Sequence, residues 1–263
     1  MLKTIVMTTY YKNEKYIDQC IKVLNIFWKG HPDIYVVGEK GHFKHSKKYS
    51  VDTSDWSVRL AQGLNFLARD GILRDGDYLL LLNEDHVPLL PISNEKIEKI
   101  AKYMKINKIA FVSLSGYGRD KLESKIDDIE IYAQSEYMEF YAELQPSIWE
   151  FNHLLCIVSK ACQERISDPW RFEYIKDTEM HFTSIYAYSG KGIWPSRLEG
   201  FMNKGRVSLN SVFAMKNPIF SKLRLRLILD FLYDLPSYIA CWVKKKLRSI
   251  MARIKKWKFF MLA

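Results

Sequence analysis

Short apolar runs alternate with helical patterns along the first half of the chain. Runs of aliphatic and β-branched residues, which are typical of strands, occupy residues 4–8, 34–37, 78–82 and 109–114. Between these runs, apolar side chains recur every three or four residues, as on one face of a helix, within residues 17–27, 56–67 and 97–104. This alternation of strands and helices predicts a layered α/β sheet.

The run at residues 78–82 predicts the centre of that sheet. It holds five apolar residues without polar alternation, which is typical of a strand covered on both faces. The oxygen-bearing side chains of residues 52–55 can cap the helix that follows them. Residues 129–149 are strand-like and aromatic, and residues 151–166 predict a helix that ends at residues 167–169.

The net charge of +10 is confined to one end of the chain. Residues 216–263 hold 12 of the 40 Lys and Arg residues but only 2 of the 30 Asp and Glu residues, so residues 1–215 are neutral overall. We therefore expect two parts, a catalytic α/β domain over residues 1–215 and a basic helical tail over residues 216–263.

The cysteines and the N-terminus favour a cytoplasmic protein. The four cysteines form no CxxC pair and show no disulfide-like spacing. The first apolar run spans only five residues and includes a threonine, which is too short for the core of a signal peptide.

Two adjacent acids, Glu84 and Asp85, directly follow the predicted central strand. In open α/β sheets, ligands lie beyond the carboxyl ends of the strands, so this position is a candidate site. Carboxylate oxygens bind Mg²⁺ or Mn²⁺ together with substrate phosphates. The alternative is an ordinary acidic turn, but the position after the central strand favours a metal site.

A second candidate site lies at residues 168–173. Glu173 follows Trp170 and Phe172, and a carboxylate beside aromatic side chains can have a raised pKa and act as a general base. The alternative is that both aromatic side chains pack in the core while Glu173 caps a helix start. The sequence leaves the two interpretations open.

Five segments of the chain occur in an informative order: TTY after the first strand, DWSVRLAQGLNFL, DYLLLLNEDHVPLL, AELQPSIWEFNHL and DPWRFEY. Together they resemble a bacterial group of GT-A-fold glycosyltransferases from surface-polysaccharide clusters, for capsule or lipopolysaccharide, over about residues 1–210. The resemblance implies a GT-A-like (Rossmann-like) mixed sheet flanked by helices. It also implies that Glu84 and Asp85 bind the metal and the diphosphate, although Asn83 and Val87 leave the usual Asp-x-Asp pattern incomplete.

The same resemblance implies roles for further residues. Thr9 and Glu39, at the ends of the first two strands, would contact the nucleotide, with Arg59 nearby. The sugar and acceptor cleft would be lined by Gln145, Trp149 and Trp170. Glu173 falls where inverting members carry the base that deprotonates the acceptor hydroxyl, which implies a single displacement at the anomeric carbon. A retaining mechanism stays open if Glu173 is not the base.

Lys204 and Arg206 flank a glycine near the end of the predicted catalytic domain. Two cations in this arrangement could close over a diphosphate. A solvated loop is the alternative interpretation.

The basic tail predicts two amphipathic helical segments. Residues 223–233 are apolar with two arginines, Pro236 is expected to break the helix, and residues 239–257 carry apolar side chains on one face with cations around it. No uncharged run is long enough to span a bilayer, so we expect the tail to lie on an anionic membrane surface at the inner face of the cell membrane. The interleaved aromatic side chains favour lipid over nucleic acid, and docking of a second copy is a third interpretation.

The sequence thus predicts a peripheral membrane glycosyltransferase that moves a sugar from a nucleotide sugar to a glycan or lipid-linked glycan. The alternative is a non-catalytic, membrane-peripheral sugar-binding or scaffold protein with the same fold, which the incomplete Asp-x-Asp pattern supports. Nucleic-acid binding is the third hypothesis, and we expect no nucleic-acid partner.

Overall fold

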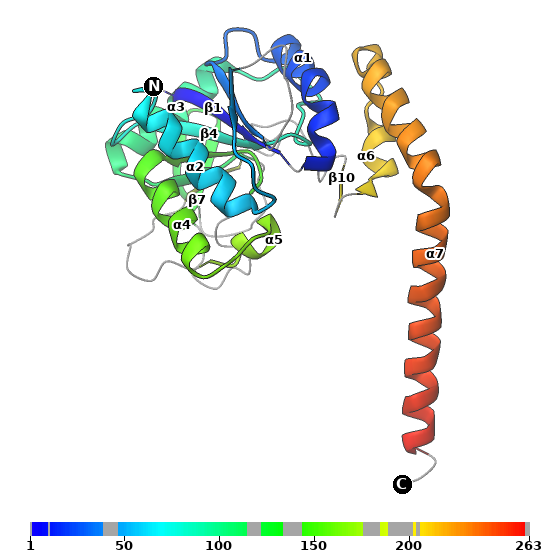
Figure 1. The fold of residues 1–263 in the computed structure, drawn as a ribbon. Helices are drawn as coiled ribbons and strands as arrows, with labels where there is room; N and C mark the ends of the chain where they lie inside the picture. Colours follow the sequence, from blue (N-terminus) through cyan, green and yellow to red (C-terminus); the bar gives the residue numbers. More distant parts are fainter. Residues whose placement is uncertain are drawn as a thin grey trace. The chain divides into compact units, whose positions relative to one another are not determined.

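The computed structural model describes residues 2–9, 11–38, 47–114, 122–133, 144–175, 185–188, 202–203 and 206–260 (Figure 1). The chain divides into two compact units, residues 1–205 and residues 206–263. The boundary expected between residues 215 and 216, as the limit between catalysis and membrane association, stays a prediction.

The described part of the first unit holds ten strands, five α-helices and one 3-10 helix. The strands are β1 (Leu2–Thr8), β2 (Ile34–Gly38), β3 (Lys47–Ser50), β4 (Tyr78–Asn83), β5 (Phe111–Ser113), β6 (Leu122–Ile126), β7 (Ile129–Ala133), β8 (Ser147–Glu150), β9 (Ile185–Tyr188) and β10 (Met202–Asn203). The helices are η1 (Tyr11–Tyr16), α1 (Ile17–Phe27), α2 (Trp56–Arg69), α3 (Asn94–Asn107), α4 (Phe151–Gln163) and α5 (Pro169–Phe172), of which η1 is the 3-10 helix.

The main sheet has six strands in the order β3-β2-β1-β4-β8-β5. Strands β3, β2, β1 and β4 run parallel, whereas β8 is antiparallel to both β4 and β5. Thr8 at the end of β1 pairs with Val37 in β2 and with Asn83 in β4, so these three strands end at one edge. The structure therefore confirms the α/β class expected from the sequence, a GT-A-like mixed sheet flanked by helices. A second sheet, β6-β7-β9, is antiparallel.

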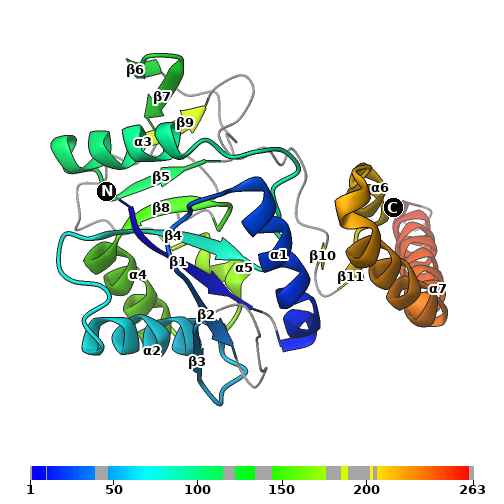
Figure 2. The same cartoon turned by 90° about the horizontal axis from the view of Figure 1, so that it is seen from above.

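Helices cover both faces of the main sheet (Figure 2), and side chains from the central strands enter a core on each face. Ile5 and Leu80 join the buried residues of α1 and α3, whereas Val6 and Leu79 join those of α2 and α4. A fully buried aliphatic side chain of this kind contributes about 1.5–3 kcal/mol to folding. The uninterrupted apolar run of residues 78–82 is explained by this two-sided burial, as predicted.

Local sequence signals account for the positions of the helices. The side chain of Asp55 caps α2 by accepting a hydrogen bond from the Val58 N–H at 3.1 Å, which confirms the predicted cap. A Cβ atom at Gly63 would lie 2.5 Å from the nearest side-chain atom of Val37, so a glycine is required where α2 packs on β2. Asp168 caps α5, and Pro169 is in the first turn, where its missing N–H costs nothing.

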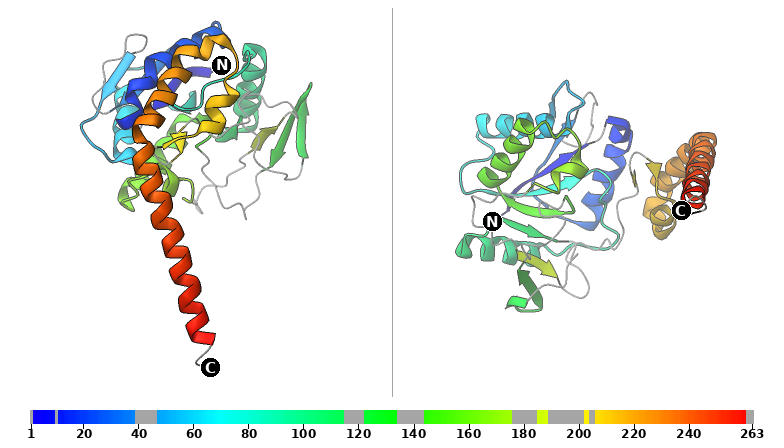
Figure 3. Two further views of the ribbon diagram at one scale, coloured as in Figure 1. Left: turned by 90° about the vertical axis from the view of Figure 1, so that its right-hand side faces the viewer. Right: turned by 90° about the horizontal axis from the view of Figure 1, so that it is seen from below.

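The second unit contains β11 (Arg206–Val207), α6 (Leu209–Ala214), the 3-10 helix η2 (Pro218–Phe220) and α7 (Ser221–Phe260). The expected helix break at Pro236 is wrong, because α7 continues through this residue as one helix (Figure 3). Proline removes a single backbone donor, at a cost of about 3 kcal/mol, and the turns on either side remain helical. In the described part of the chain, no helix is both long and apolar enough to cross a membrane.

Candidate active site at the carboxyl edge of the sheet

The polar turn after β4 is attached to the end of β1. The Thr8 hydroxyl donates to Asn83 Oδ1 at 2.7 Å, and the Glu84 backbone N–H donates to the Thr8 carbonyl at 3.2 Å. These bonds place the predicted acidic motif at the carboxyl edge of three parallel strands. Ligands of open α/β sheets bind at this edge.

Glu84 is a buried carboxylate that is positioned by η1. Asn13 donates from Nδ2 to Glu84 Oε1, although the two residues lie 71 positions apart in the chain. Thr9, which directly follows β1, donates from its hydroxyl to Glu14 Oε1 at 3.3 Å. Asn13 was not predicted from the sequence, where its one signal is its position in the polar segment directly after the first strand.

Asp85 and Cys20 complete the surroundings of the acidic turn. Asp85 Oδ1 lies 3.5 Å from Nδ1 of the buried His86. Burial raises the pKa of the Cys20 thiol well above its ordinary value, and the negative charges of Glu84 and Asp85 raise it further. The thiol therefore stays protonated and contributes no negative charge beside the two acids.

The oxygen atoms around Glu84 are suited to a hard cation. Within the described ranges, no three or more His, Cys, Asp and Glu side chains gather into a group that could hold a metal ion by themselves. Mg²⁺ needs only one or two carboxylates when substrate phosphates supply further oxygens. Asn13 Oδ1, which is buried without a hydrogen-bond partner among the described residues, adds another acceptor. The donor set therefore fits a cation shared with a diphosphate and does not fit a closed structural metal site.

Glu173 stands at the C-terminal end of α5. The Leu144 N–H donates to its Oε1 atom at 3.0 Å, and burial raises the pKa of the carboxyl group, an effect that this hydrogen bond reduces. The alternative in which Glu173 caps a helix start is wrong, because Asp168 does so. Phe172 is a core residue packed against Trp56, with ring centroids 5.1 Å apart, whereas Trp170 is 49% exposed.

A chain of hydrogen bonds connects the two candidate sites. Asn83 accepts from Thr8 and donates from Nδ2 to the Leu144 carbonyl at 3.2 Å. The N–H of the same Leu144 donates to Glu173. The acidic turn and the predicted base are thus linked through Asn83 and Leu144, so the two candidate sites of the sequence form one region.

Arg59 lies near the start of α2, which packs beside α5. The Trp56 N–H donates to the Ser167 carbonyl at 3.0 Å, which fixes the two helices to each other. Arg59 is buried, and its Nη2 atom lies 3.5 Å from the Ser54 carbonyl. Its predicted role near the nucleotide stays a prediction.

Trp149 corrects an expectation. It is 1% exposed and lies in β8 between the Phe111 and His153 rings, with Nε1 donating to Ser147 Oγ at 2.9 Å. A side chain without exposed surface cannot line an acceptor cleft, so Trp149 is a core residue. Gln145, next to Leu144, is partly exposed and keeps its predicted role as a prediction.

Three further predicted contacts are untested by the geometry. Glu39 and Lys204 lie outside the described residues. Arg206 begins β11 in the second unit, and its side chain also lies outside the described part.

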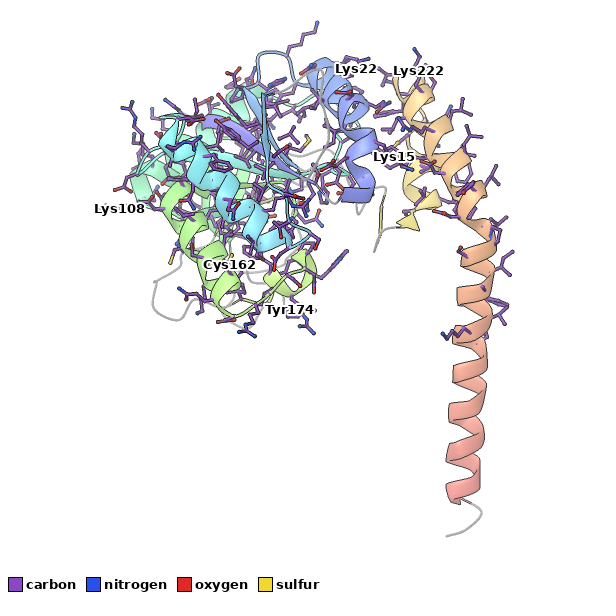
Figure 4. The ribbon with its side chains drawn as sticks, viewed as in Figure 1. Lys15, Lys22, Lys108, Cys162, Tyr174 and Lys222 are labelled. Atoms are coloured by element: carbon purple, nitrogen blue, oxygen red, sulfur yellow. The ribbon has the colours of Figure 1, made fainter. Side chains whose placement is uncertain are left out.

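Tyr174, directly after Glu173, is half exposed and lies beside α5 (Figure 4).

No protein-family model matches the chain, and no curated protein matches it significantly. Similar solved structures include a cytidylyltransferase from Leptospira borgpetersenii, with TM-score 0.42 and 12% identity, covering 82% of this chain and 94% of that one. Another is 4-diphosphocytidyl-2C-methyl-D-erythritol synthase from Anaerococcus prevotii, with TM-score 0.41 and 12% identity, covering 71% of this chain and 90% of that one. A third is S. aureus TarS 1–349, with TM-score 0.36 and 15% identity, covering 71% of this chain and 60% of that one. Similarities this low do not indicate a shared activity.

Proposed function

We propose that this chain is a glycosyltransferase that moves a sugar from a nucleotide sugar to a hydroxyl of a glycan or lipid-linked glycan, in bacterial surface-polysaccharide synthesis. The observation that carries the proposal is the partly buried Glu173 carboxyl group, which is connected by hydrogen bonds through Leu144 and Asn83 to the acidic turn at the carboxyl edge of the sheet. A base and a site for a charged leaving group are thereby held in one region.

Glu173 has the properties of a general base. Its raised pKa makes the carboxylate a stronger proton acceptor than an exposed glutamate, provided that the pH lies above the raised value. The Leu144 N–H holds Oε1, so Oε2 can face the acceptor hydroxyl. In the proposed step, Glu173 takes the hydroxyl proton while the acceptor oxygen bonds to the anomeric carbon. The bond from that carbon to the diphosphate oxygen breaks, and the diphosphate leaves with the electron pair, so the configuration inverts.

Glu84 and Asp85 serve the leaving group in this proposal. Two carboxylates alone would repel a diphosphate, so they need a cation between them and the substrate. A bound Mg²⁺ or Mn²⁺ would neutralise the negative charge that develops on the diphosphate. Asn13 orients Glu84 for this role through its hydrogen bond.

Asn83 explains why the family's Asp-x-Asp pattern is incomplete here. Its amide uses both ends, accepting from Thr8 and donating to Leu144. An aspartate would lose the second bond, because an ionised carboxylate has no donor. An asparagine at this position is therefore explained by its two hydrogen bonds. Its presence is compatible with catalysis as well as with the scaffold alternative.

A thermal-shift screen tests the proposal. Purified protein is melted with UDP-, GDP-, CMP- and dTDP-sugars, each with and without Mn²⁺ or Mg²⁺, since a ligand that binds only the folded state raises the melting temperature. We expect a metal-dependent rise with one nucleotide class. The rise should disappear in Glu84→Gln and Asp85→Asn and persist in Glu164→Gln, an exposed acid on the same unit.

The non-catalytic alternative makes a different prediction. A sugar-binding scaffold should keep its cellular function through Glu84→Gln, Asp85→Asn and Glu173→Gln tested separately. Loss of polymer in the Glu173→Gln strain, with normal protein levels, argues for the transferase. No thermal shift with any donor in folded protein argues for the scaffold.

A further inference from the structure

Helix α7 exposes large apolar side chains along one side. Leu225, Leu229, Leu232, Ile239 and Val243 are between 41% and 59% exposed. Each of these residues follows the one before it at a spacing of three, four or seven positions, so that they lie on one face of the helix. Exposed apolar side chains that line up in this way mark a binding surface.

The core of the second unit uses a different face of α7. Leu223 and Leu227 are buried, together with Val212 and Phe220 from the neighbouring elements of that unit. At about 100° per residue, Leu223 and Leu227 lie nearly opposite Leu225 and Leu232 around the helix. The exposed apolar face is therefore not needed to fold this unit.

The pattern continues to the end of the helix. We call its members the apolar stripe: Leu225, Leu229, Leu232, Pro236, Ile239, Val243, Leu247, Ile250, Ile254 and Trp257. All fall within an arc of about 80° on a regular helix, and no polar residue of α7 after Ser221 falls in this arc. Over 40 residues, α7 is about 60 Å long.

The apolar stripe runs straight along α7. A straight stripe fits a flat partner surface better than a second helix. A strict seven-residue repeat drifts around an α-helix and makes two helices supercoil. Here two successive spacings of four, from Ile239 to Val243 and on to Leu247, break that repeat. Residues about 18 positions apart, such as Leu225 and Val243, lie at the same angle around the helix, because 18 residues make five turns. A stripe that stays on one side of the helix matches a plane.

The charges of α7 complement an anionic plane. Among the cations of α7 whose side chains the structure describes, Lys222, Arg226 and Lys244 lie by register on one side of the stripe, and Arg224 and Lys246 lie on the other. Both acids, Asp230 and Asp234, fall on the face away from the stripe. Lys222 begins this array in the first turn (Figure 4). Long basic side chains beside an apolar face can reach headgroups while their methylenes cover apolar surface.

We propose that α7 binds an anionic lipid surface, lying parallel to it with the apolar stripe at the level of the acyl boundary and the flanking cations on the headgroup phosphates. Apolar burial and the attraction of anionic lipids, about 1 kcal/mol per cation near the surface, act together in this arrangement. This interaction does not depend on the proposed activity. It would hold the catalytic unit beside lipid-linked acceptors.

Vesicle flotation of the full chain tests this proposal. Phosphatidylcholine vesicles with and without phosphatidylserine are floated at low and high NaCl. We expect binding to the anionic vesicles that weakens as salt rises, because salt screens the headgroup attraction. Ile239→Asp combined with Val243→Asp places two charges in the stripe and should lower binding at least about tenfold.

The control places acids elsewhere on α7. Ser237 and Tyr233 lie outside the stripe, and both are exposed. The double variant Tyr233→Asp with Ser237→Asp adds the same charge outside the stripe, on its cationic flank, and should lower binding less than Ile239→Asp with Val243→Asp does. Circular dichroism confirms that both variants keep their helix, and the donor-induced thermal shift should be unchanged in both.

Three results would overturn the proposal. One is equal vesicle binding by the stripe variant and the control. The second is a wild-type chain that forms a stable dimer and does not bind vesicles, with the dimer lost in the stripe variant. This result would mean that the stripe binds a second copy of the chain. The third is binding of RNA or DNA at physiological salt without vesicle binding.

Discussion

The carboxyl edge of the sheet and helix α7 present their polar and apolar groups in opposite ways. At the sheet edge, polar side chains are buried and hydrogen-bonded to residues far away in sequence, as in the bond between Asn13 and Glu84. On α7, apolar side chains are exposed and repeat locally. Buried polar groups with defined partners are suited to positioning reacting atoms, whereas a repeated exposed pattern is suited to an extended surface. Each region should therefore respond to a different kind of substitution.

The largest effect is expected at Glu173. Glu173→Gln preserves the shape and can still accept from the Leu144 N–H, but it cannot take a proton. We expect the transfer rate to fall about 10²–10⁴-fold, the usual contribution of a general base, while the donor-induced thermal shift persists. Transfer of labelled sugar is the measurement. An equal loss in Glu164→Gln would contradict the assigned role.

The two faces of α7 should differ sharply in their contribution to stability. Leu227 is 0% exposed and Leu229 is 57% exposed, two positions further along the helix. Leu227→Ala should cost about 2–5 kcal/mol of local stability, whereas Leu229→Ala should stay within about 0.5 kcal/mol. Hydrogen exchange of the α7 amides measures this difference. Similar losses would mean that the stripe also serves the fold.

Asn83→Asp tests whether the Asp-x-Asp motif or the hydrogen bond from Asn83 to Leu144 matters more for transfer. It completes an Asp-x-Asp motif with Asp85, but it removes the donor to the Leu144 carbonyl. We expect a loss of about 1–3 kcal/mol in unfolding free energy and about a tenfold slower transfer. Urea denaturation and the transfer assay measure these effects.

Asn65→Asp is the matched control for that substitution. Asn65 is exposed, and its amide donates within α2 to the Ala61 carbonyl at 2.9 Å. We expect this variant to change both quantities little. Faster transfer in Asn83→Asp would show that the motif matters more than the bond.

The smallest expected effect is a pH dependence of stability at Glu173. Burial raises the pKa of this carboxyl group in the folded state, so the group's contribution to stability is fully present below the unfolded pKa of about 4.3 and is lost as pH rises through the folded pKa. Glu173→Gln should therefore raise the melting temperature relative to wild type at neutral pH and lose this advantage at acidic pH. Thermal unfolding over a pH series measures the difference, and Glu164→Gln should show none of it.

Local patterns predicted the framework of the fold but not its long-range contacts. The central strand at residues 78–82 and the Asp55 cap follow from neighbouring residues alone, and both were predicted. Trp149 was assigned to a cleft by the resemblance to glycosyltransferases, and its neighbours in sequence do not show that its side chain faces the core. The bonds from Asn13 to Glu84 and from Asn83 to Leu144 span 71 and 61 positions, and nothing local encodes them.

The α7 pattern shows the same distinction. Its apolar spacing was visible in the sequence, whereas the passage of the helix through Pro236 was not. A local rule gives the probable effect of a proline, but the bonds of the turns around it decide whether the helix ends.

The configuration of the product tests the central claim most directly. A donor of known anomeric configuration is supplied with its acceptor, and the proton coupling at the anomeric carbon of the product is read by NMR. A single displacement with Glu173 as the base predicts the inverted configuration and, in Glu173→Gln, a transfer rate about 10²–10⁴-fold lower. A retained configuration, or full activity in that variant, would contradict the account.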